Sequence, residues 1–114
     1  MKHVYVVQTN PVEGKEDEYN DWYEHQHLDD ILRLPGFVSA QRFRLADTDP
    51  AQSAAQRYLA IYEIETDDIN AVNMTMVAAA GGPSLPLSDA LDLSNFSGAY
   101  FEAIGEKVTR DSAL

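Results

Sequence analysis

The stretch YNDWYEHQHLDDILRLPGFVSAQRFRL, residues 19–45, decides the fold because it predicts a helix, a sharp stop and a strand in immediate succession. With about 100° of rotation per residue, a helix over residues 15–34 gathers one inward face. Acidic residues at 16–18 suit the first turn, where the helix dipole favours negative charge. Pro35-Gly36 ends the helix, and residues 37–45 predict a strand. The inward face comprises Tyr19, Tyr23, His27, Asp30, Ile31 and Leu34.

The flanking sequence supplies the remaining elements. Residues 3–9, 57–64 and 96–104 are rich in β-branched and aromatic side chains and predict strands. A second helix is expected from an N-cap at Thr66 to about residue 80, where glycines break it. Loops are expected at 46–56 and 84–95, the latter with a turn of helix at 87–91. The order β-α-β-β-α-β predicts an α+β, ferredoxin-like fold with a four-stranded antiparallel sheet and both helices on one face.

The predicted strands are apolar on both faces, for example Val4 and Val6 against Tyr5 and Val7. A sheet with one solvated face would alternate more cleanly. We therefore expect the second face to pack on a twin, giving a homodimer whose two sheets close into a dimeric α+β barrel. Residues 1–105 are expected to form one domain, followed by a polar C-terminal tail at 106–114.

Composition limits the function classes. The 114 residues suit one domain and contain no cysteine, which excludes disulfides, thiolate metal sites and cysteine nucleophiles. A formal net charge of -11 disfavours nucleic acid and anionic membranes as partners. The first ten residues lack the apolar run of a signal peptide, and no segment reaches membrane-spanning length, so a cytoplasmic location is expected.

Three features of the opening stretch resemble the dimeric α+β barrel superfamily, in particular its EthD-like branch: Trp22, His27-Leu28, and the turn Pro35-Gly36-Phe37. The resemblance covers roughly residues 3–80. Gln26 stands where an acidic residue is usual, and Asp29 where proline is usual. The resemblance implies the ferredoxin-like fold and carries His27 over as a site residue.

A more distant likeness is to polyketide cyclases of the same superfamily, whose first strand also opens with a Lys-His pair, here Lys2-His3. That resemblance implies that His3 borders a substrate pocket; a strand-end residue without a role is the alternative. The second histidine that such cyclases carry after their second helix has no counterpart in residues 74–83. The superfamily also includes haem-handling proteins, isomerases and monooxygenases, so fold alone does not define function.

His27 is the leading catalytic candidate because an imidazole titrates near neutral pH and can act as a general base. Asp30, at i+3 on the same face, could orient it. Two alternatives remain open: His27 as a buried structural histidine, and Asp30 paired with Arg33. His25 points the other way around the helix, so His27 and Asp30 are too few to hold a metal ion, and no metal site is expected.

Aromatic residues are the other candidates. Tyr23 or His3 could donate a hydrogen bond to a developing oxyanion. The apolar segment 74–93 could cover the pocket. Burial in the hydrophobic core without contact to a ligand is the alternative for the further candidate pocket residues, which are Tyr5, Tyr19, Trp22, Tyr58 and Tyr62.

These features favour an enzyme without cofactor that transfers a proton on a small, apolar carbonyl, aromatic or polyketide-like compound, as a cyclase, isomerase or lyase. No phosphate-binding or nucleotide motif is present in the sequence. A non-catalytic protein that binds a metabolite, and a haem-binding protein, are the alternatives.

Overall fold

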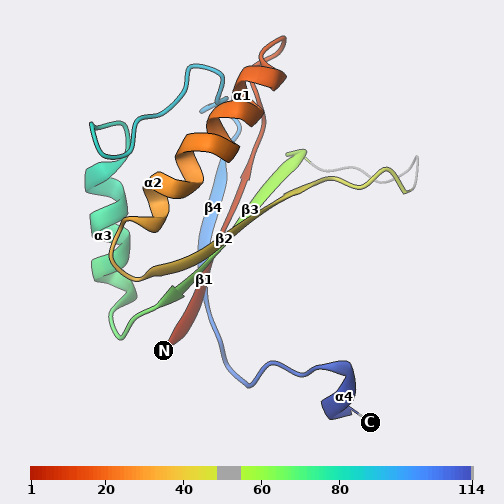
Figure 1. Ribbon diagram of the computed structural model, residues 1–114, viewed down its shortest axis with the longest axis vertical. Helices are drawn as coiled ribbons and strands as arrows, with labels where there is room; N and C mark the ends of the chain where they lie inside the picture. Colours follow the sequence, from red (N-terminus) through yellow and green to blue (C-terminus); the bar gives the residue numbers. More distant parts are fainter. Residues whose placement is uncertain (49–54, 114) are drawn as a thin grey trace.

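The computed structural model describes residues 1–48 and 55–113 and has the predicted α+β order (Figure 1). The expected loop at 46–56 lies partly outside the described residues. In chain order, the elements are β1 (Lys2–Thr9), α1 (Glu16–Trp22), the π-helical turn η1 (Tyr23–His27), α2 (Leu28–Leu32), β2 (Phe37–Arg44), β3 (Tyr58–Glu65), α3 (Ile69–Ala79), β4 (Ser97–Glu102) and α4 (Arg110–Ala113).

The four strands form one antiparallel sheet in the order β2-β3-β1-β4, as the ferredoxin-like prediction requires. In the register, Tyr5 of β1 lies opposite Tyr62 of β3 and Tyr100 of β4. The run α1-η1-α2 and helix α3 cover the same face of the sheet (Figure 1). The predicted fold class is confirmed.

The core lies between this face and the helices. Along β3 every second side chain is buried, so that Tyr58, Ala60, Tyr62 and Ile64 point toward the helices. From the helical run, Tyr19, Tyr23 and Ile31 meet them, as does Val72 of α3. The inward face predicted from helical periodicity is therefore confirmed at these positions.

In the described part of the chain, no helix covers the opposite face of the sheet (Figure 1). We call this surface the open face and define it by Val4, Val6, Phe43, Leu59, Ile61 and Phe101, which alternate along their strands with the residues that face the helices. In the single chain, Phe43 is 41% exposed and Phe101 is 55% exposed. An apolar face of this kind is typical of a surface that a partner covers.

Two local expectations were wrong. The N-cap of α3 is Asp68 rather than Thr66: the Asp68 carboxylate accepts the N–H of Ala71 at 3.1 Å, while Thr66 Oγ1 accepts the N–H of Asp68. The turn of helix expected at 87–91 does not form. The polar tail contains the short helix α4.

The turn after α2 confirms the role of Pro35-Gly36 as a stop. Gly36 has a φ of 93°, a left-handed conformation that favours glycine. Its missing side chain also leaves room for Val72 of α3, which would lie 3.1 Å from a Cβ there. Gly36 thus ends the first helix and lets α3 approach the start of β2.

Candidate functional site

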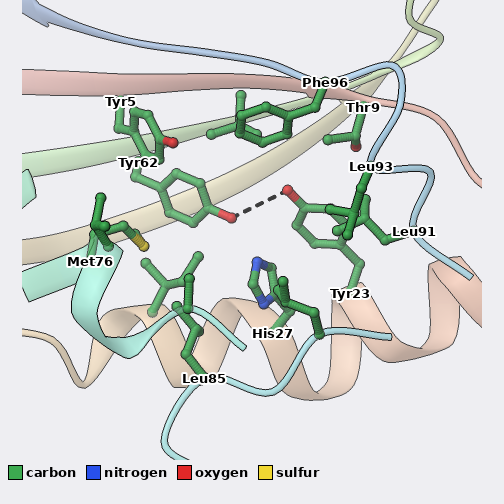
Figure 2. A pocket seen from close by; sticks show the side chains of 15 residues that line it. Tyr5, Thr9, Tyr23, His27, Tyr62, Met76, Leu85, Leu91, Leu93 and Phe96 are labelled. Atoms are coloured by element: carbon green, nitrogen blue, oxygen red, sulfur yellow. Dashed lines mark hydrogen bonds between the residues drawn. The ribbon is translucent and has the colours of Figure 1, made fainter. Parts of the chain in front are cut away.

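A cavity of about 350 Å³ lies between the sheet, the helical run, α3 and the segment after α3 (Figure 2). Its volume falls within the range of small-molecule sites. Its lining is almost wholly apolar or aromatic and consists of Tyr5, Val7, Thr9, Tyr23, His27, Ile31, Tyr62, Met76, Val77, Ala80, Leu85, Leu87, Leu91, Leu93 and Phe96.

The π-helical turn η1 brings two of the predicted catalytic residues to the cavity. In this wider turn the N–H of Leu28 bonds to the carbonyl of Tyr23, an i→i+5 bond. Tyr23 and His27, at the two ends of η1, are both buried and both line the cavity. Single π turns within α-helices are frequent at functional sites.

His27 is held between two aromatic rings. The indole of Trp22 stacks on the imidazole with ring centroids 4.4 Å apart, and the ring of Tyr23 meets it edge-on at 5.0 Å. Burial lowers the pKa of His27 to about 4, and the nearby Asp30 charge offsets only part of this effect. The imidazole is therefore neutral at pH 7, with a lone pair free to accept a proton.

Asp30 pairs with Arg33, which is one of the two alternatives that the sequence left open. Its Oδ1 accepts a hydrogen bond from Arg33 Nη1 at 2.7 Å. Within the described residues, Asp30 Oδ2 and His27 Nδ1 are both buried without a hydrogen-bond partner. Asp30 thus acts on His27 through its charge and not through a direct hydrogen bond in this conformation.

Two tyrosine hydroxyls meet beside His27. Tyr62, from β3, donates a hydrogen bond to the hydroxyl of Tyr23 at 3.4 Å, and Figure 2 shows the two groups pointing toward one another. Burial raises the pKa of Tyr23 to about 12 and raises that of Tyr62 as well. Both are therefore protonated at pH 7. Because Tyr23 accepts the hydrogen bond from Tyr62, its own O–H remains available to donate to a ligand.

A cation lies behind these phenols. The guanidinium of Arg42 sits over the ring of Tyr23, 4.6 Å from its centroid, and donates to Asn20 at 2.7 Å. Cation–π contact of this kind stabilises the rings at the end of the cavity. Arg42 itself does not belong to the cavity lining.

Of the predicted pocket residues, Tyr5 and Tyr62 line the cavity, together with Tyr23 and His27. His3, Tyr19, Trp22 and Tyr58 do not. His3 is buried beside the Met1 carbonyl, and Trp22 lies behind His27.

The hydroxyls of Tyr19 and Tyr58 are used within the core. Tyr19 exchanges a 2.5 Å hydrogen bond with Thr9. Tyr58 donates to the carboxylate of Glu16 and accepts from Asn20. These hydrogen bonds hold the helical run to the sheet, and neither hydroxyl belongs to a residue of the cavity lining.

The segment 74–93, expected as a pocket cover, supplies seven lining residues: Met76, Val77, Ala80, Leu85, Leu87, Leu91 and Leu93. Val7 and Thr9 were missed, although their period-two spacing from Tyr5 places them on the same strand face. Phe96 was missed as well, and no local pattern distinguishes it. Its place depends on how the chain enters β4.

The family model described as "Domain of unknown function (DUF4286)" matches residues 2–110. The chain belongs to the DUF4286 family. No curated protein matches this DUF4286 member.

Solved structures with the same fold include three relatives of this DUF4286 protein. The haem degrader MhuD of Mycobacterium tuberculosis, with two haems bound in its active site, has a TM-score of 0.57 at 18% identity, covering 93% of this chain and 99% of its own. A protein of the ethyl tert-butyl ether d (EthD) family from Bacillus halodurans C-125 has a TM-score of 0.53 at 13% identity, with coverage of 91% and 100%. A dimeric ferredoxin-like protein of unknown function from Jannaschia sp. CCS1 has a TM-score of 0.56 at 16% identity, with coverage of 90% and 100%.

The likeness establishes the ferredoxin-like fold of this DUF4286 protein, which the EthD family protein shares. At these identities it does not transfer an activity. Within residues 1–48 and 55–113, no group of three His, Asp or Glu side chains is placed to hold a metal ion. None of the helices over the same residues is long and apolar enough to cross a membrane.

Proposed function

We propose that this protein binds a small, uncharged aromatic or otherwise apolar carbonyl compound in the cavity and transfers a proton at the carbon next to the carbonyl, with His27 as the general base. Many isomerisations, cyclisations and lyase-type cleavages begin with such a step. The observation that carries the proposal is the placement of one neutral imidazole beside two protonated phenols at the wall of an apolar cavity.

The charge of the ligand follows from the lining. Among the lining residues in the described part of the chain there is no Asp, Glu, Lys or Arg. A charged ligand would lose its hydration without gaining a counter-ion, which is costly in an apolar site. The aromatic rings of Tyr5, Tyr62 and Phe96 favour a flat, unsaturated ligand.

In the proposed step the ligand's carbonyl oxygen accepts the hydrogen bond from Tyr23. The C–H bond at the adjacent carbon breaks, the proton passes to an imidazole nitrogen of His27, and the electron pair forms an enolate whose oxygen is stabilised by Tyr23. Tyr62 supports Tyr23 by donating to it. In the unliganded cavity His27 is a weak base, but the developing enolate charge beside it stabilises the imidazolium and raises its pKa.

Asp30 is proposed as a positioning residue. Its carboxylate charge favours the imidazolium, and its second oxygen is buried without a partner near the helix face that carries His27. The pair with Arg33 holds this carboxylate in a fixed orientation.

The proposal is tested with acetophenone and 2-acetonaphthalene, two uncharged aryl methyl ketones. Deuterium exchange of their methyl protons in D₂O, followed by NMR, reports proton transfer without knowledge of the natural substrate. We expect His27→Gln to lower the catalysed exchange by about 10²- to 10⁴-fold. Tyr23→Phe should lower it by about 10²-fold or more. His25→Gln, an exposed histidine on the same turn, is the matched control and should exchange at the unmodified rate.

The two alternatives give different outcomes. Tight binding without exchange would indicate a protein that sequesters its ligand. For haem, the neutral His27 could serve as an axial ligand, but among residues 1–48 and 55–113 no Lys or Arg lines the cavity to meet the two propionates, so the residues present do not fit a buried haem. A Soret band shift on titration with haemin that disappears in His27→Gln would overturn that conclusion.

We further propose that the protein is a homodimer in which two open faces meet. The support is the apolar character of that face and the ferredoxin-like fold shared with a dimeric protein. Burial of Phe43 and Phe101 against a second copy would remove apolar surface from water, the main driving force for association.

A further inference from the structure

Gly98 lies beneath the aromatic end of the cavity. It is in β4, opposite Val7 of β1, on the side of the sheet that faces the helices. Two residues of the cavity lining, Tyr5 and Phe96, lie directly over it. In Figure 2 the same two rings line the sheet side of the cavity.

A side chain at this position would collide with both rings. A Cβ on Gly98 would lie 2.8 Å from the hydroxyl oxygen of Tyr5, 3.1 Å from Cζ of Phe96 and 3.3 Å from Cε1 of Tyr5. The first of these distances is shorter than non-bonded contacts allow. Within the described residues, the glycines with positive φ are Gly14, Gly36 and Gly81, so the backbone of Gly98 does not itself call for glycine. Space alone does.

The ring of Tyr5 has little freedom to move aside. It stacks on Tyr100 with ring centroids 4.3 Å apart and an interplanar angle of 13°, and it approaches Tyr62 at 6.0 Å. A Cβ on Gly98 points from the sheet toward the cavity. It would therefore lift the hydroxyl end of Tyr5 and the tip of Phe96 into the space where a ligand binds.

We propose that Gly98 is a specificity-determining residue: by carrying no side chain, it lets Tyr5 and Phe96 lie against the sheet and so sets the size of the ring system that the cavity accepts. This inference rests on the proposed role of the cavity as a small-molecule site. It does not depend on the proton-transfer step. Glycine weakens a strand interior, and its presence in strands often marks a close approach, which fits this position.

The test compares two ligands that differ by one fused ring, acetophenone and 2-acetonaphthalene, by isothermal titration calorimetry. Gly98→Ala should weaken binding of the two-ring ketone by about tenfold or more and change that of the one-ring ketone only slightly. Gly105→Ala is the matched control, because a Cβ there meets nothing within 4 Å. Circular dichroism checks that each variant is folded.

A second variant separates a cavity effect from a folding defect. Tyr5→Phe removes the oxygen that lies nearest to the new Cβ but leaves the contact with Phe96, so the double variant Gly98→Ala with Tyr5→Phe should recover part of the affinity for 2-acetonaphthalene. Equal loss for both ketones, no loss, or no recovery in the double variant would overturn the inference while leaving the proton-transfer proposal in place.

Failure of the unmodified protein to bind either ketone would overturn both proposals. Binding with the expected size dependence but without deuterium exchange would overturn the proton-transfer proposal alone. A Gly98→Ala protein that does not fold, with a double variant that does not fold either, would assign Gly98 to packing and overturn the inference.

Discussion

The indole of Trp22 stacks on the imidazole of His27, with ring centroids 4.4 Å apart and an interplanar angle of 28°. The two residues are five positions apart on a helix, and the π-helical turn between them is part of the same run. The indole shields one face of the imidazole from water. This contact contributes to the burial that keeps His27 neutral.

Replacing Trp22 should therefore raise the pKa of His27. Trp22→Ala exposes the imidazole, and its pKa should move from about 4 toward 6.5, as measured by NMR titration of the ring protons. The same change should cost about 3–5 kcal/mol of stability. Trp22→Phe, which keeps an aromatic ring, should give a smaller shift in the same direction. A pKa that stays near 4 in both variants would show that other residues bury the imidazole.

Stability should fall in acid because of His27. Its pKa in the folded protein is about 4, below the unfolded value near 6.5, so the folded state binds fewer protons between these values. The full contribution is present above about pH 6.5 and is lost as the pH falls toward 4, by about 3 kcal/mol. Urea unfolding of the unmodified protein and His27→Gln across this range measures the difference. His25→Gln should retain the acid loss. Parallel pH profiles for the unmodified and His27→Gln proteins would contradict the prediction.

Asp30→Asn should lower the pKa of His27 further, because the carboxylate charge is the one contribution that raises it. The same substitution weakens the pair with Arg33 on the surface. Asp29→Asn, an exposed neighbour on the same helix, is the matched control and should leave the titration of His27 unchanged. If both variants titrate like the unmodified protein, Asp30 has no electrostatic effect on the site.

Phe101→Glu should convert the proposed homodimer to a monomer. The side chain is 55% exposed in the single chain, so the fold should tolerate the charge, but two such charges on facing sheets would repel. Sedimentation velocity should report twice the chain mass for the unmodified protein and a single chain for the variant. Met74→Glu is the control, since Met74 is 72% exposed on α3, away from the open face. A monomeric unmodified protein would refute the barrel.

The sequence was sufficient for the order of elements, because each depends on neighbours along the chain. The spacing of Tyr19, Tyr23 and Ile31 predicted one buried helix face, and Pro35-Gly36 predicted its end. The same spacing placed His27 inward, and it is buried. Local spacing could not locate the N-cap of α3, since Thr66 and Asp68 are both good caps and the backbone path after β3 chose between them.

Only the tertiary structure decided which polar groups remain free for a ligand. On the helical face Tyr19 and Tyr23 look alike, yet the hydroxyl of Tyr19 is bound to Thr9 while that of Tyr23 faces the cavity. Asp30 accepts a hydrogen bond from Arg33, and Gly98 lies under Tyr5 and Phe96. The helical periodicity of a sequence determines which side of an element is buried. The partner of each buried group is determined by the packing of segments far apart in the chain. The periodicity of side chains along one element cannot predict such contacts.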